Sequence, residues 1–252
     1  MKSRILFSVL ALVMMGRIAG AELSDAELTR IGKKVWANEC AGTVAGLTSW
    51  NEGEDFASLG IGHFIWYPAG RQGPFEESFP RLIEYLASQG VKVPAWTRGA
   101  CPWPNREAFM ASQRKPRLGD LRALLASTVP LQARFIAQRM HEALPKMLAA
   151  VPASEAGKVR NNFARLETTE AGTFALIDYV NFKGEGTLET ERYKGQGWEL
   201  LQVLETMDPD ADPVRGFSAA ARAVLARRVR NSPPERHEER WLPGWELRVA
   251  RY

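Results

Sequence analysis

Hydrophobic residues recur at helical spacing along most of the chain. In the first such segment Leu28, Ile31 and Val35 lie one turn apart, and a Ser-x-x-Glu capping pair begins at Ser24. This pattern predicts a helix that begins just after Ser24. Glu39 follows Val35 by four residues, so the predicted helix carries this carboxylate on its apolar stripe, near its C-terminal end.

The same spacing predicts further helices in the rest of the chain. They are expected at residues 78–90, 105–111, 118–125, 131–151, 155–166, 170–182, 198–207 and 218–229. Residues 42–68 differ, because they are rich in Gly, Thr, Ser and aromatic residues and lack the helical period. Short strands with glycine turns are predicted there, at 47–50, 56–61 and 64–67. The predicted class is mainly α (α+β), with one helical domain over residues 22–252 and a small β-hairpin near its N-terminus.

The first 21 residues follow a different pattern. Lys2 and Arg4 precede an apolar run over residues 5–15, and the small residues Ala-Gly-Ala follow at 19–21. This order predicts a cleavable signal peptide, Met1–Ala21, and hence a periplasmic or secreted protein. The run is shorter than the roughly 20 apolar residues that cross a bilayer, although an uncleaved anchor is the alternative. No later segment is long and apolar enough to predict a membrane span.

Removal of the leader changes the charge of the chain. The full sequence has a formal net charge of +4, from 33 Lys and Arg against 29 Asp and Glu. Three of the basic residues, Lys2, Arg4 and Arg17, lie in the leader, which leaves 30 against 29. A nearly neutral chain does not favour a nucleic-acid partner.

Two cysteines, Cys40 and Cys101, remain in the predicted mature chain. Export to an oxidising compartment favours a disulfide between them. A bridge across so long a loop would stabilise the fold by about 4 kcal/mol on the loop-entropy model. Two buried free thiols are the alternative.

Metal and cofactor chemistry has no support in the sequence. The three histidines, His63, His141 and His237, are widely spaced, and no Cys/His cluster has the spacing of a zinc site. The chain has no nucleophile elbow, phosphate loop or dinucleotide fingerprint. No cofactor is therefore expected.

The acidic residues near the predicted hairpin indicate a candidate chemistry. Glycoside hydrolysis needs a protonated carboxyl beside the leaving oxygen, and usually a second group that activates water or stabilises the transition state. Glu39, at the end of an amphipathic helix, is in a setting that keeps a carboxyl protonated. Glu52, Glu54 and Asp55 follow on the β element. A helix-end glutamate is also common as a solvated or ion-paired residue.

Two sequence motifs carry a resemblance to a known family. Residues 58–63, Ser-Leu-Gly-Ile-Gly-His, resemble the Thr-Ile-Gly-(Ile/Tyr)-Gly-His strand of phage-type lysozymes. Residues 174–186, Phe-Ala-Leu-Ile-Asp-Tyr-Val-Asn-Phe-Lys-Gly-Glu-Gly, resemble that family's buried helix and the glycine-containing turn that ends it. The order and rough separation of the two motifs also agree with the family.

This resemblance implies a lysozyme-like fold and a peptidoglycan-cleaving glycosidase. It places the catalytic acid on Glu39, the hairpin acid on Glu52 and the threonine of the family on Ser58, with Glu54 or Asp55 as alternatives to Glu52. The candidate substrate-binding residues are Trp50, Gly60, His63, Trp66, Asn181 and Tyr193.

Several of these candidates also have a structural interpretation. The aromatic residues are suited to stacking on sugars, but they equally suit a strand edge packed on the core. Gly60 allows close approach of a substrate or merely permits a turn. His63 contacts the catalytic region or fixes the strand turn. Tyr193 lines the far wall of a cleft or lies in an exposed loop.

The departures from the family leave the reaction open. The interval from Glu39 to Ser58 is longer than in phage enzymes, the hairpin acid is Glu rather than Asp, and Ser58 lacks the methyl group of threonine. Lytic transglycosylases share the broader fold, but there Ser usually follows the catalytic glutamate, whereas Cys40 follows it here. The sequence is therefore compatible with two reactions, hydrolysis of the glycosidic bond and closure of an anhydro ring.

Two non-catalytic alternatives also remain at this point. One is an exported lysozyme-fold protein that binds wall glycan or inhibits a lysozyme, and the other is an exported scaffold. The arginine-rich end, which includes Arg236, Arg240 and Arg248, is expected to clamp the C-terminus onto the domain or, alternatively, to bind anionic wall polymers.

Overall fold

A computed structural model describes residues 23–73, 75–189 and 191–252. The predicted signal peptide, Met1–Ala21, lies outside the described residues. The described chain forms ten α-helices and one three-stranded antiparallel sheet, which confirms the predicted mainly α (α+β) class. None of its helices is long and apolar enough to cross a membrane.

Most helices lie where the hydrophobic period predicts them. The α-helices are α1 (Asp25–Cys40), α2 (Phe79–Ser88), α3 (Arg106–Ala111), α4 (Pro116–Ser127), α5 (Val129–Ala149), α6 (Ala153–Glu167), α7 (Glu170–Lys183), α8 (Leu200–Thr206), α9 (Pro213–Asn231) and α10 (Leu242–Val249). Four short 3-10 helices are η1 (Ala45–Leu47), η2 (Ala95–Arg98), η3 (Pro234–Arg236) and η4 (Glu238–Arg240). The strands are β1 (Thr48–Ser49), β2 (Ala57–Leu59) and β3 (Phe64–Trp66).

The start of α1 is set by its own sequence. The Ser24 hydroxyl accepts from the Glu27 backbone N–H at 3.3 Å, and the Glu27 carboxylate accepts from the Ser24 backbone N–H at 2.9 Å. These two bonds satisfy donors that a helix start leaves unpaired, so the predicted capping box is confirmed. The helix then buries Leu28, Ile31 and Val35 on one face.

The sheet has one buried face and one half-exposed face. Ser58 in the central strand β2 lies opposite Ser49 in β1 and Ile65 in β3, so these three side chains share a face. Ser49 and Ile65 are half-buried there. On the other face, Leu59 and Trp66 are completely buried in the core. This alternation is what period-2 side-chain geometry requires of a sheet packed on one side.

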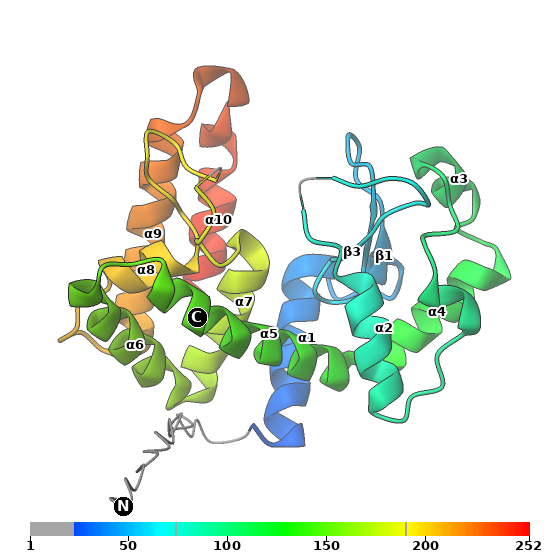
Figure 1. The fold of residues 1–252 in the computed structure, drawn as a ribbon, viewed down its shortest axis with the longest axis horizontal. Coiled ribbons are helices and arrows are strands. Elements are labelled where there is room, and N and C mark those ends of the chain that lie inside the picture. The colour runs from blue at the N-terminus through cyan, green and yellow to red at the C-terminus, as the bar shows by residue number, and fades with distance from the viewer. Residues whose placement is uncertain (1–22, 74, 190) are drawn as a thin grey trace, which may run out of the picture.

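Helices α1 and α5 lie at the centre of the molecule (Figure 1). Figure 1 shows the sheet and α2–α4 on one side of them and α6–α10 on the other side. Helix α5 contacts α1, α2, α6 and α7, so it connects the two sides. The end of α1 that carries Glu39 therefore lies between the sheet and the C-terminal helices.

The C-terminal segment is tied down by a buried carboxylate. Glu238, in η4, is completely buried. It accepts from Arg228 Nε at 2.7 Å, Arg236 Nε at 3.2 Å and the Tyr193 hydroxyl at 2.9 Å. Hydrogen bonds from Arg228 and Tyr193 hold the pKa of this carboxyl below its usual value, although burial alone would raise it. Arginine residues thus clamp the chain end onto the domain.

The two cysteines do not form the predicted bridge. Cys40 and Cys101 are both buried free thiols. Cys40 ends α1 and its Sγ lies 3.5 Å from the Gly60 carbonyl oxygen, whereas the Cys101 backbone N–H donates to the Tyr67 carbonyl at 3.0 Å. Each cysteine is held by different neighbours, and burial raises the pKa of each thiol to about 12.

Candidate functional site

Glu39 is the centre of the candidate site. It is the second-last residue of α1, and its side chain is 11 % exposed. The next residues leave the helix through a left-handed turn at Ala41 and Gly42, with φ of 51° and 66°. Three other elements reach the Glu39 carboxylate: the turn between β2 and β3, helix α7 and helix α10.

Each of these elements contributes one polar contact. His63, from the β2–β3 turn, places Nδ1 3.4 Å from Glu39 Oε2. Asn181, near the end of α7, donates from Nδ2 to Glu39 Oε1 at 3.3 Å. Arg248 of α10 donates from Nη2 to the same Oε1. The His63 and Asn181 contacts bring both sequence motifs onto one carboxylate.

A second carboxylate, Asp178 of α7, holds Arg248 in place. Arg248 donates from Nε to Asp178 Oδ2 and from Nη2 to Oδ1, both at 2.8 Å. The Tyr252 hydroxyl donates to Oδ2 at 2.8 Å, and Asn38 Nδ2 donates to Oδ1 at 3.1 Å. Asp178 is completely buried; its charge is balanced by Arg248, and it accepts four hydrogen bonds, two of them from Arg248.

The cluster therefore has two carboxylates around one guanidinium. Burial alone would lower the pKa of Arg248, but the hydrogen bonds and charge of Asp178, with a smaller contribution from Glu39, raise it overall. Arg248 is thus a fixed cation. Asp178 accepts two hydrogen bonds from it, whereas Glu39 accepts one. Glu39 shares a charge that is already engaged, and it lies at a helix C-terminus, where a carboxylate is disfavoured. The two acids therefore share one guanidinium, and Glu39 is the more exposed of the two.

His63 is held in an uncommon backbone conformation. Its φ is 47°, in the left-handed region that few non-glycine residues occupy. Its Nδ1 faces Glu39, and its Nε2 is buried without a hydrogen-bond partner among the described residues. The strained turn thus aims an imidazole at the carboxylate.

Gly60 is explained by packing rather than by substrate approach. It is buried, with φ of 68°, and an added Cβ would collide with Gln132 Oε1. Gln132 is completely buried in α5 and accepts from the Ile61 backbone N–H at 3.0 Å, which fixes the β2–β3 turn to this helix. Packing thus accounts for glycine at this position, because a buried side chain already occupies the space beside it.

The predicted hairpin acids lie in the connection between β1 and β2. Glu52 is exposed and has no ion pair or side-chain hydrogen bond within the described segments. Glu54 is half-buried and its Oε2 is buried with no partner there, while Asp55 pairs with Arg71 at 3.5 Å. Ser58 is buried in β2. None of these residues contacts the cluster around Glu39 through a hydrogen bond or ion pair in the described structure.

The predicted aromatic platform is part of the core. Trp66 is completely buried and donates from Nε1 to the Gly99 carbonyl at 2.9 Å. Trp50 is 4 % exposed and packs on Phe109 with ring centroids 5.7 Å apart. Both rings are thus covered by the core, which is the structural interpretation of these residues and not the sugar platform.

Tyr193 belongs to the C-terminal anchor. Its hydroxyl donates to the buried Glu238, and its ring packs on Trp198 at 4.5 Å between centroids. Within the described chain it has no polar contact with the residues around Glu39. Tyr193 therefore contacts Glu238 and Trp198 in the C-terminal anchor, and its predicted contact with the far wall of a cleft is not seen in the described structure.

Sequence reasoning missed Asp178 as a site residue and assigned Arg248 to the chain-end clamp or to the binding of anionic wall polymers. Asp178 lies within the second motif, three residues before Asn181, on the same face of α7. Arg248 is 209 residues from Glu39 in the sequence, so no local pattern joins the two. A buried aspartate in an otherwise apolar helix was the available signal, because such a charge needs a partner.

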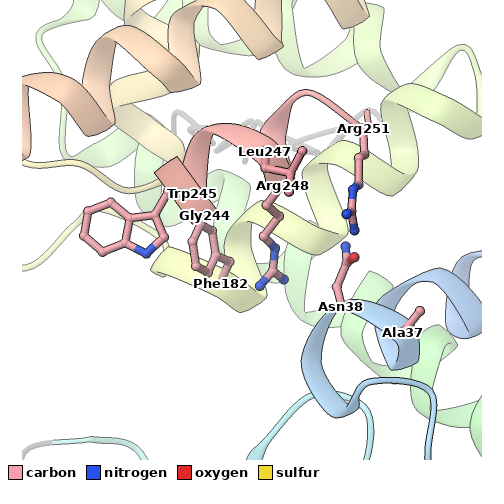
Figure 2. A pocket seen from close by; sticks show the side chains of 8 residues that line it. All are labelled: Ala37, Asn38, Phe182, Gly244, Trp245, Leu247, Arg248 and Arg251. Carbon is pink, nitrogen blue, oxygen red and sulfur yellow. The ribbon is translucent and has the colours of Figure 1, made fainter. Parts of the chain in front are cut away.

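A pocket of about 260 Å³ adjoins the cluster (Figure 2). Its lining comes from the end of α1, the end of α7 and helix α10 with the residues after it: Ala37, Asn38, Phe182, Gly244, Trp245, Leu247, Arg248 and Arg251. Over the described ranges, no group of three or more His, Cys, Asp or Glu side chains is arranged to hold a metal ion. No family model matches the chain, and searches of curated proteins and of solved structures gave no match either.

Proposed function

We propose that this protein is a peptidoglycan-cleaving glycosidase of lysozyme-like type, with Glu39 as the proton donor. The observation that carries the proposal is the meeting of three segments at one carboxylate. His63, from the first lysozyme-like motif, and Asn181, from the second, both contact Glu39 at the end of α1. Two motifs that were matched independently of each other thus converge on the residue that the resemblance makes catalytic.

The charges around Glu39 support a role in proton transfer. When Glu39 carries a proton and His63 is neutral, Asp178 and Arg248 balance each other and the cluster has no net charge. When Glu39 is ionised, the cluster carries one uncompensated negative charge. Proton donation by Glu39 therefore leaves a net negative charge beside the bond that breaks, where positive charge develops on the sugar.

The proposed reaction begins with Glu39 giving its proton to the glycosidic oxygen. The bond from the anomeric carbon to this oxygen breaks, and positive charge develops on the sugar. A water then attacks the anomeric carbon, with Glu52 as the candidate base, and the product has a reducing end. If a hydroxyl of the same sugar attacks instead, an anhydro ring forms. In both cases the proton of the attacking hydroxyl passes to a carboxylate of the site.

A second candidate function is that of a non-catalytic wall-glycan-binding protein. The observation that favours it is the direct ion pair between Glu39 and Arg248, since such a pair also stabilises the ionised carboxylate. Wild-type protein that binds peptidoglycan and releases no product would establish this second function.

The decisive experiment is mass analysis of the products released from purified peptidoglycan. Glu39→Gln keeps an oxygen for the Arg248 hydrogen bond, but its amide has no acidic proton to give to the glycosidic oxygen. Since general acid catalysis is typically worth about 10²–10⁴ in rate, we expect this variant to lose at least about 99 % of the activity. Reducing ends would identify hydrolysis and anhydro ends a transglycosylase. Glu52→Gln then tests whether water placement depends on the hairpin acid.

Glu84→Gln serves as the matched control. Glu84 lies exposed on α2, and the substitution removes the same charge without touching the cluster. Thermal unfolding of each variant shows whether the fold is retained. Full activity in a folded Glu39→Gln variant would refute the assignment of Glu39.

A further inference from the structure

The pocket beside Glu39 has the character of an anion site. It lies between the end of α1 and helix α10, and Figure 2 shows the Arg248 and Arg251 guanidinium groups pointing toward α1 and α7. Its eight lining residues include these two arginines and no Asp or Glu. The pocket therefore presents the positive charge of Arg251 beside a second guanidinium, Arg248, whose charge is shared with Asp178 and Glu39.

The charge of Arg251 is not satisfied by the protein. Arg251 is exposed and makes no ion pair or side-chain hydrogen bond with residues 23–73, 75–189 or 191–252. Arg248 uses Nε and Nη2 for Asp178 and Glu39, and its Nη1 bonds to none of those residues. Donors thus remain available on both guanidinium groups that line the pocket.

The other walls of the pocket are apolar and held in place. Arg248 Cζ lies 4.1 Å from the centre of the Phe182 ring. Lys183 Nζ lies 4.0 Å from the same ring and 3.6 Å from the Trp245 ring, and Arg228 Cζ lies 5.0 Å from Trp245. The cation–π contacts of Arg248 and Arg228 fix the two rings, and the Lys183 side chain packs against both.

Lys183 contributes little charge to this region at neutral pH. Burial, followed by the nearby charge of Arg228, lowers its pKa to about 6. The cationic character of the pocket therefore comes mainly from Arg251, and Arg248 adds the free donor at Nη1.

We propose that this pocket binds the carboxylate and small apolar side chain of a short peptide carried by the wall glycan. This assignment rests on the proposed glycosidase function and extends it to the peptide part of the substrate. A volume of about 260 Å³ is below that of common ligand pockets, so it fits a substituent rather than a length of polymer. The peptide carboxylate accepts from Arg251 and from Arg248 Nη1, and a methyl group packs against Trp245 and Leu247.

The position of the pocket links peptide recognition to the site of cleavage. Arg248 contacts Glu39 through Nη2 and lines the pocket, and Asn38 lies next to Glu39 in α1 and lines it as well. A peptide held here keeps its sugar close to the proton donor. Peptide-bearing glycan is accordingly the preferred substrate, with the preference expressed in KM.

Direct binding of a model peptide tests the pocket without any catalysis. The probes are N-acetyl-alanyl-alanine and its C-terminal amide, titrated into wild-type protein while the tryptophan indole signals are followed by NMR. We expect the acid to bind at least about tenfold more tightly than the amide, because charge-assisted hydrogen bonds are about twice as strong as neutral ones. Equal affinities, or no binding of the acid at millimolar concentration, would overturn the assignment.

Arg251→Gln locates the binding within the pocket. It should weaken binding of the acid about three- to tenfold, since one charged hydrogen-bonding partner is lost. Arg160→Gln, at an exposed position on α6, removes the same charge elsewhere and should leave binding unchanged. An equal effect of both substitutions would mean that net charge, and not the pocket, attracts the peptide.

Turnover separates this proposal from the proposed function. Arg251→Gln should raise KM on peptide-bearing peptidoglycan by a similar three- to tenfold factor and leave KM unchanged on peptidoglycan stripped of its peptides. If Glu39→Gln abolishes cleavage while the acid and amide bind equally, only the pocket assignment fails. If the acid binds selectively and wild-type protein releases no product, only the glycosidase proposal fails.

Discussion

The ion pair between Arg248 and Asp178 makes a quantitative prediction about stability. Arg248→Met removes both 2.8 Å hydrogen bonds to Asp178 and the contact with Glu39, while it keeps a side chain of similar length. Asp178 is completely buried, so water cannot replace the lost partner. The variant therefore leaves a buried carboxylate without its counter-ion.

The expected loss follows from this environment. Removal of one partner from a buried ion pair typically costs about 3–5 kcal/mol. Asp178 still accepts from Tyr252 and Asn38 in the variant, so we expect the lower end, about 3 kcal/mol. At about 2–4 °C per kcal/mol for a chain of this size, Tm falls by about 6–12 °C.

Adding Asp178→Asn to the same chain should reverse much of this loss. The double variant has no unpaired buried charge, and the amide still takes part in hydrogen bonds with Tyr252 and Asn38. We expect it to recover at least about half of the lost free energy of unfolding, because most of the cost is that of the uncompensated charge.

Urea unfolding, followed by far-UV circular dichroism and tryptophan fluorescence, measures the single and the double variant against the wild type. Arg71→Met is the matched control, because it breaks the exposed Arg71–Asp55 pair and should cost less than about 1 kcal/mol. A loss below about 1 kcal/mol in Arg248→Met, or a double variant no more stable than the single one, would refute the reasoning from buried charge.

Two further substitutions test other parts of the structure. Burial raises the pKa of Glu199, which is 1 % exposed, to about 7 from an ordinary value of 4.5. The folded state therefore holds a proton that the unfolded state has released, and stability falls as pH rises from 4.5 through 7. Glu199→Gln should remove this fall and stabilise the protein by about 1–3 kcal/mol in urea unfolding at pH 8, with little change at pH 4.5. Gly60→Ala should cost at least about 2 kcal/mol, because it combines a positive φ with a collision at Gln132. Gly70→Ala, with φ of 72° and open space around it, isolates the backbone cost of about 1 kcal/mol, and an equal loss in both variants would contradict the packing argument.

The helices near the site were predictable because their signals are local. The capping box at Ser24 and the apolar stripe behind it determine where α1 starts and which face it buries, and hence that Glu39 lies at its inner end. The small sheet was also placed correctly, although its strands are shorter than predicted. Helix α10 was not predicted, because only Val249 of its residues is buried and its apolar pattern is short.

The candidate site was predictable only in part. The resemblance carried by the two motifs predicted Glu39, His63 and Asn181 as site residues. In the structure, His63 Nδ1 lies 3.4 Å from Glu39 Oε2, and Asn181 Nδ2 lies 3.3 Å from Glu39 Oε1. The same sequence pattern suggested Trp50 and Trp66 as sugar platforms. An aromatic residue on a strand faces core or solvent depending on what covers the sheet, and that is a tertiary property.

What the sequence by itself determined is the set of elements and the position of Glu39 on one of them, since capping and periodicity act over a few residues. Only the tertiary structure decided what surrounds that carboxylate. Arg248 reaches Glu39 across 209 residues of sequence, and Asp178 becomes a site residue because it holds Arg248. The two cysteines remain apart for the same reason: pairing depends on distance in the folded chain, which no local pattern encodes.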